Sequence, residues 1–170
     1  MKKLLALALT LSLALFATAA LAVDLNWTDV EEQVAGLDAA FVNIDQVGVK
    51  IWMPTILEAQ ELTDEDIADG YIAYFQTADE SAAVGVTYTD VEGMSLEDYA
   101  AEVAKVGGTG IENMTVNGLN CIGYDLEEND TSVVAFATEA GYILEFSFAP
   151  VSDEGFAATV LLMVASIQAI

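Results

Sequence analysis

The chain has 170 residues, of which 28 are acidic and four are lysine, and it contains no histidine or arginine, for a formal net charge of −24. This charge excludes nucleic acid as a partner, because too few cations are present to neutralise phosphates and release their counterions. It equally excludes docking on an anionic membrane surface.

Residues 1–22 predict a secretory signal peptide. Lys2 and Lys3 precede an apolar stretch, residues 4–17, and Ala20-Leu21-Ala22 supplies a small-x-small cleavage site. Cleavage after Ala22 leaves 23–170 as one domain, with 28 acids against two lysines, a formal charge of −26. The alternative is a retained membrane anchor, although the apolar stretch is shorter than the ~20 residues that a spanning helix needs. We therefore expect a secreted protein, extracellular or held in the periplasm or cell envelope.

The first part of this domain predicts a short helix and a hairpin. Thr28 reads as an N-cap with Glu31 three residues on, a capping-box spacing, and Gly36 as the end of the helix. Residues 40–45 and 47–54 alternate as two strands around a turn, and a proline ends the second. Trp52 points away from its apolar neighbours in that strand, so it is either a recognition anchor on a wet face or, as we favour, a core residue.

The middle of the chain continues with two hairpins and the clearest helix. Residues 62–70 form an acidic loop with one helical turn capped by Thr63, and 71–77 and 82–90 form a hairpin. Residues 94–108 predict a helix that Ser95 caps and Gly107 ends. The pair Asn117-Gly118 joins strands 111–116 and 119–126, since both turn positions need positive φ.

The last elements are a fourth hairpin and a terminal helix. Strands 132–138 and 142–148 flank a short turn, and the second strand alternates apolar residues with Glu145 and Ser147. That alternation predicts a sheet with one covered side and one wetter side. Ser152 reads as the cap of the final helix. Its apolar stripe is Phe156, Val160, Met163 and Ile167.

These elements predict an α+β fold, in which an antiparallel sheet built from hairpins has helices packed outside it. The layout resembles the PsbP-like fold, an α/β/α sandwich named for an extrinsic subunit of photosystem II. The segments that carry the resemblance are "KIWMP", "SLEDYAAEV", "VNGLNCIGYD" and "YILEFSFAP…ATVLLMVASI". The resemblance implies the architecture and a binding or accessory role, and no functional residue is transferred by it.

The sequence lacks the residues that usually activate a catalytic nucleophile. Cys121 is the only cysteine, and a reactive thiol needs a nearby cation or helix N-terminus to lower its pKa. Without histidine there is no Ser-His-Asp arrangement, and a cysteine metal site would need further cysteines or histidines. We interpret Cys121 as a buried structural thiol, with an intermolecular disulfide as the alternative.

Two acidic loops leave calcium binding as an alternative. One loop carries Asp64, Asp66 and Asp69. The other carries Asp125, Glu127, Asn129 and Asp130. Neither loop has the glycine and glutamate spacing of an EF-hand. A solvated loop is the simpler interpretation of each. Paired carboxylates of a hydrolase are a weaker alternative, because among 28 acids some pair at a suitable distance arises by chance.

The sequence therefore predicts a secreted, non-enzymatic binding or accessory module. Its partner is an unknown protein or small-molecule ligand. We predict no catalytic, cofactor-binding or metal-binding residues and no cofactor. A calcium-dependent structural or adhesion domain and a carboxylate-dependent envelope hydrolase remain as alternatives.

Overall fold

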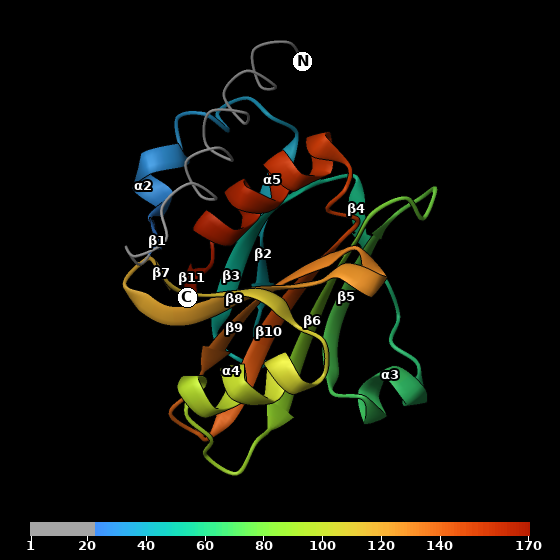
Figure 1. Ribbon diagram of the computed structural model, residues 1–170. Coiled ribbons are helices and arrows are strands. Elements are labelled where there is room, and N and C mark those ends of the chain that lie inside the picture. The colour runs from blue at the N-terminus through green and yellow to red at the C-terminus, as the bar shows by residue number, and fades with distance from the viewer. Residues whose placement is uncertain (1–22) are drawn as a thin grey trace.

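The computed structural model describes residues 23–170, so the predicted signal peptide lies outside the described residues (Figure 1). An eight-stranded sheet has the order β1-β7-β8-β9-β10-β6-β5-β4, and a three-stranded sheet has the order β11-β3-β2. The larger sheet comprises β1 (Val23–Leu25), β4 (Leu57–Ala59), β5 (Tyr71–Thr77), β6 (Ala83–Asp90), β7 (Thr109–Val116), β8 (Leu119–Leu126), β9 (Thr131–Ala137) and β10 (Tyr142–Ala149). The smaller sheet comprises β2 (Ala39–Ile44), β3 (Val49–Pro54) and β11 (Gln168–Ala169). The helices are α2 (Trp27–Val30), α3 (Asp64–Ala68), α4 (Leu96–Lys105) and α5 (Glu154–Ala165), with one 3₁₀ turn, η1 (Glu127–Asn129).

The two faces of the larger sheet pack against different layers. On one face α5 and the smaller sheet pack against the larger sheet (Figure 1). The main core between them includes the fully buried Phe146, Phe148 and Met163. On the other face α4 covers a second, smaller core that contains Val103 and Ile143. The fold is thus α+β with helices outside the sheets, as the sequence predicts. Within residues 23–170, none of the helices combines the length and the hydropathy needed to cross a membrane.

The four predicted hairpins and the helix at 94–108 are confirmed, because their signals are local. Asn117 and Gly118 have φ values of 49° and 81°, the positive values that the turn between β7 and β8 requires. Ser95 caps α4 by accepting from the backbone N–H of Asp98 at 3.1 Å. Trp52 is 6% exposed and belongs to the main core, as we favoured.

The prediction for the first helix is wrong in its cap and its length. Helix α2 begins at Trp27 and ends at Val30, so Thr28 lies inside it rather than at the N-cap. The start is set by a tertiary contact, since the backbone N–H of Trp27 donates to Oδ1 of Asn117 at 2.8 Å. The capping-box signal is local and carries no information on this contact.

The cap of the last helix is also one residue from its predicted place. Asp153, not Ser152, caps α5, because its Oδ1 accepts from the backbone N–H of Phe156 at 2.8 Å. Ser152 instead donates both its backbone N–H and its hydroxyl to the carboxylate of Asp130. Ile167 is fully buried but lies beyond the end of α5. The short strands β1, β4 and β11 have no signal of their own in the sequence.

Candidate functional site

The two tyrosines of β5 lie on the same side of the larger sheet although they are three positions apart. A strand with a regular period of two would point Tyr71 and Tyr74 to opposite faces. A β-bulge between Tyr71 and Ala73 shifts the register, so that Tyr71 pairs with Thr87 and Tyr74 with Gly85. The bulge therefore brings the two rings together, with centroids 6.3 Å apart and planes at 86°.

The neighbouring strands complete a polar surface beside α4. Thr87 pairs with Glu145 and Gly85 with Ser147 across β6 and β10, so these side chains continue the rows that the tyrosines begin. We call this surface the polar face and define it by residues of intermediate exposure: Tyr71, Tyr74, Gln76, Thr87, Glu145 and Ser147. The alternation of apolar and polar residues along 142–148 predicts that one side of the sheet is wetter. The polar face is the part of that side that α4 does not cover.

The position of the Tyr71 ring on this face depends on Gly85, which has no side chain. A Cβ on Gly85 would lie 2.6 Å from Oγ of Ser147 and 2.9 Å from Cε1 of Tyr71. Both distances are too short for a real Cβ, so the ring lies over β6 only because position 85 is glycine.

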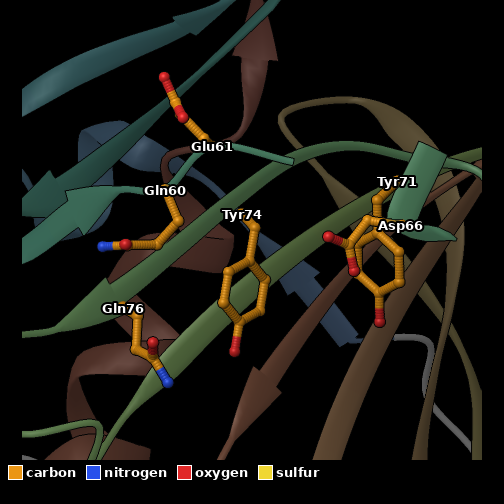
Figure 2. A pocket seen from close by; sticks show the side chains of 6 residues that line it. All are labelled: Gln60, Glu61, Asp66, Tyr71, Tyr74 and Gln76. Atoms are coloured by element: carbon orange, nitrogen blue, oxygen red, sulfur yellow. The ribbon is translucent and has the colours of Figure 1, made fainter. Parts of the chain in front are cut away.

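The polar face is hollowed next to α3 into a depression of about 400 Å³. Its lining comes from β5, from α3 and from the segment that follows β4, and Figure 2 shows the ring of Tyr74 between Tyr71 and the amide of Gln76. The lining residues are Gln60, Glu61, Asp66, Tyr71, Tyr74 and Gln76. The backbone N–H of Gln60 donates to the carbonyl of Tyr74 at 2.9 Å, which ties that segment to β5.

Asp66 is fixed by the cap of α3. Its Oδ2 accepts from both the backbone N–H and the hydroxyl of Thr63, each at 2.7 Å. The backbone N–H of Asp66 donates in return to Oγ1 of Thr63 at 3.2 Å, which completes a capping box. These bonds lower the pKa of Asp66, so the carboxylate is ionised at neutral pH. The pKa of the Tyr71 phenol is raised, first by burial and then by Tyr74 and by carboxylates that include Asp66. The depression therefore carries negative charge beside the neutral Tyr71 phenol.

A second cluster fastens α4 to the polar face. Oε1 of Glu145 accepts from the hydroxyls of Tyr99 on α4, at 2.7 Å, and of Tyr124 on β8, at 2.5 Å. Its Oε2 accepts from Thr87 at 3.3 Å. Burial, and next the Glu145 charge, raise the pKa of both tyrosines. Both oxygens of Glu145 are thereby engaged, and the bond from Tyr99 ties α4 to the sheet.

The single thiol is buried, as the sequence predicts. Cys121 is 1% exposed, and burial raises its pKa to about 12. It therefore stays protonated at neutral pH, which does not suit a nucleophile.

Several acidic residues of the two candidate calcium loops already make bonds within the chain. Asp66 accepts from Thr63, the N-cap of α3, Asp125 accepts from the hydroxyl of Ser132, and Glu127 accepts from Thr109 at 3.1 Å. In the part of the chain that the structure describes, no group of three or more acidic or cysteine side chains is placed to hold a metal ion. Calcium dependence therefore remains a hypothesis from the sequence.

Sequence reasoning missed the tyrosine pair and the Glu145 cluster. The polar residues of 142–148 pointed to the correct side of the sheet, but they gave no sign of the bulge or of which residues meet there. The tyrosine pair depends on the bulge within β5, and the Glu145 cluster joins β8, β10 and α4, which are far apart along the chain.

Comparison with known proteins supports the fold. No family model matches the chain. No curated protein matches it in sequence. Its structure is similar to the solution structure of cyanobacterial PsbP (CyanoP) from Synechocystis sp. PCC 6803, with a TM-score of 0.58 and 12% identity. The likeness covers 80% of this chain and 95% of that chain. The chain thus has a PsbP-like fold, and at this identity the likeness establishes the fold alone.

Proposed function

We propose that the chain is an exported, non-enzymatic binding or accessory module, and that it binds its ligand or partner through the polar face. The observation that carries this proposal is the depression beside α3, where a bulge and a glycine bring two tyrosines next to amides and carboxylates. A concave site with aromatic walls and a few convergent polar groups is the usual form of a ligand site.

The chemistry around the depression favours recognition over catalysis. The thiol is buried and protonated, and Glu145 is engaged by three hydroxyls. Among the described residues the lysines lie elsewhere: Lys105 pairs with Glu102 at 2.6 Å, and Lys50 lies over the ring of Phe41, with Nζ 5.0 Å from its centroid. A nucleophile at the depression would have neither a cation nor an imidazole to activate it.

The binding proposal is tested by mapping ligands onto the chain. Isotope-labelled protein of residues 23–170 is titrated with a panel of small amines, sugars and carboxylic acids, and amide shifts are followed by NMR. We expect shifts confined to β5, α3 and the segment after β4, with no conversion of the compound. Tyr74→Ser should abolish them, while the same change at Tyr142, outside the polar face, should not. Binding that maps elsewhere, or turnover of a compound, contradicts the proposal.

Export is tested through the cleavage site. We expect the full chain, expressed in a bacterium with a general secretion pathway, to yield a protein that begins at Val23, the first residue of β1. Intact mass and N-terminal sequencing of the cell fractions give the result. Ala22→Phe, which fills the small position before the cut, should leave the precursor uncleaved. A wild-type chain recovered whole in the membrane fraction would support the anchor instead.

A further inference from the structure

We infer that the depression binds an organic ammonium group, with Tyr71 and Tyr74 as its aromatic walls. This inference deepens the proposed function and rests on it. The two rings meet edge to face, at 86° with centroids 6.3 Å apart, and both line the depression. A cation over the face of an aromatic ring, within about 6 Å of its centroid, is attracted by the ring quadrupole, and perpendicular rings can serve one cation together.

No lysine of the described chain lies at the depression to balance its negative charge. Glu61 and Asp66 line it, and α3 adds further acids next to them. The lysines among residues 23–170 are Lys50, on the smaller sheet, and Lys105, at the end of α4, and neither lines the depression. An external cation would therefore meet carboxylates that no described lysine neutralises, and the same carboxylates would repel an anionic ligand.

The carboxylate of Asp66 is already oriented before a ligand arrives. Both bonds from Thr63 fall on Oδ2, which leaves Oδ1 without a donor among the described residues. On the other side Gly85 leaves the space in which the Tyr71 ring is held. A site whose walls are placed in advance loses little conformational entropy on binding. Gln60 and Gln76 add amide oxygens that can accept from an ammonium N–H or from a neighbouring hydroxyl of the ligand.

Charge, rather than shape, is what the test must isolate. The probes are choline chloride and its neutral isostere 3,3-dimethylbutan-1-ol, titrated by NMR and calorimetry at constant ionic strength. We expect saturable choline binding with shifts at Tyr71 and Tyr74, and binding of the isostere weaker by about tenfold or more. Equal binding of the two compounds, or no saturation with choline, overturns the inference.

Matched variants assign the binding to the tyrosines and the acid. Tyr74→Leu should weaken choline binding about fivefold to thirtyfold, and Tyr74→Phe, which keeps the ring, should change it less than about twofold. Asp66→Asn should weaken it, whereas Glu139→Gln, the same charge change in the β9–β10 turn, should not. Tyr142→Leu, in the stacked Tyr88–Tyr142 pair, is the aromatic control. Thermal unfolding confirms that each variant is folded, and unchanged binding by folded Tyr74→Leu refutes the inference.

The same titrations separate this inference from the proposed function. A neutral sugar that binds the polar face where choline does not would refute the ammonium site and leave the binding module standing. If no compound of any class shifts the polar face, both proposals fail.

Discussion

Replacing Asn117 with alanine lowers the free energy of unfolding by about 3 kcal/mol, since three side-chain hydrogen bonds of roughly 0.5–1.5 kcal/mol each are lost. Nδ2 of Asn117 donates to the carbonyls of Ala165, at 2.8 Å, and Ile167, at 2.7 Å. Its Oδ1 accepts from the backbone N–H of Trp27 at 2.8 Å. One turn residue thereby joins the β7–β8 hairpin to the start of α2 and to the end of α5. Chemical denaturation of residues 23–170 measures the change.

Two control variants divide the effect of Asn117 into its parts. Asn117→Gly removes the side chain but tolerates the φ of 49°, so it should be more stable than Asn117→Ala by about 1 kcal/mol. Asn117→Asp keeps the acceptor for Trp27 but places a carboxylate oxygen against the carbonyls of Ala165 and Ile167, so it should be less stable than Asn117→Gly. If Asn117→Gly unfolds at the same denaturant concentration as the wild type, the three bonds contribute nothing and the expected result is wrong.

Asn117 also shows how far the sequence predicts this fold. The pair Asn117-Gly118 gave the turn and its positive φ values, because that requirement is carried by the two residues themselves. The bonds to Trp27, Ala165 and Ile167 could not be predicted, since their partners lie 90, 48 and 50 positions away. The same contact displaced the start of α2 from its predicted cap at Thr28. Local signals therefore fixed the hairpins, while tertiary contacts decided the ends of the first helix.

The candidate site depends on a break in the pattern that sequence reading uses. Alternation along 71–77 assigns Tyr71 to the side of Ala73 and Phe75, and only the bulge moves it to the side of Tyr74. The sequence did not predict that Gly85 makes room for the Tyr71 ring either, because its lack of a side chain matters only once Tyr71 lies over β6. The wetter side of the sheet was predictable from Glu145 and Ser147, and the hollow on it was not.

The Glu145 cluster should make the protein unstable at alkaline pH. Tyr99 and Tyr124 have their pKa values raised above about 10, the ordinary value for tyrosine, by burial and by the Glu145 carboxylate. Their contribution to stability is fully present below pH ~10 and is lost as the pH rises from there toward the folded-state pKa values, because the unfolded chain ionises first. Of the six tyrosines, we expect these two to ionise only as the chain unfolds. Phenolate absorbance, followed together with circular dichroism, measures both events.

Variants of the cluster test whether Glu145 holds α4 to the sheet. Glu145→Ala should lower the free energy of unfolding by about 3 kcal/mol, because two hydroxyls lose a charged acceptor worth roughly 1.5–3 kcal/mol each. Tyr99→Phe and Tyr124→Phe should each flatten the alkaline loss of stability. In a double-mutant cycle, Glu145→Ala should cost little in a chain that already carries both phenylalanines. A native chain in which all six tyrosines titrate near pH ~10 would show that Tyr99 and Tyr124 are not held by Glu145, and α4 would then depend on its apolar contacts alone.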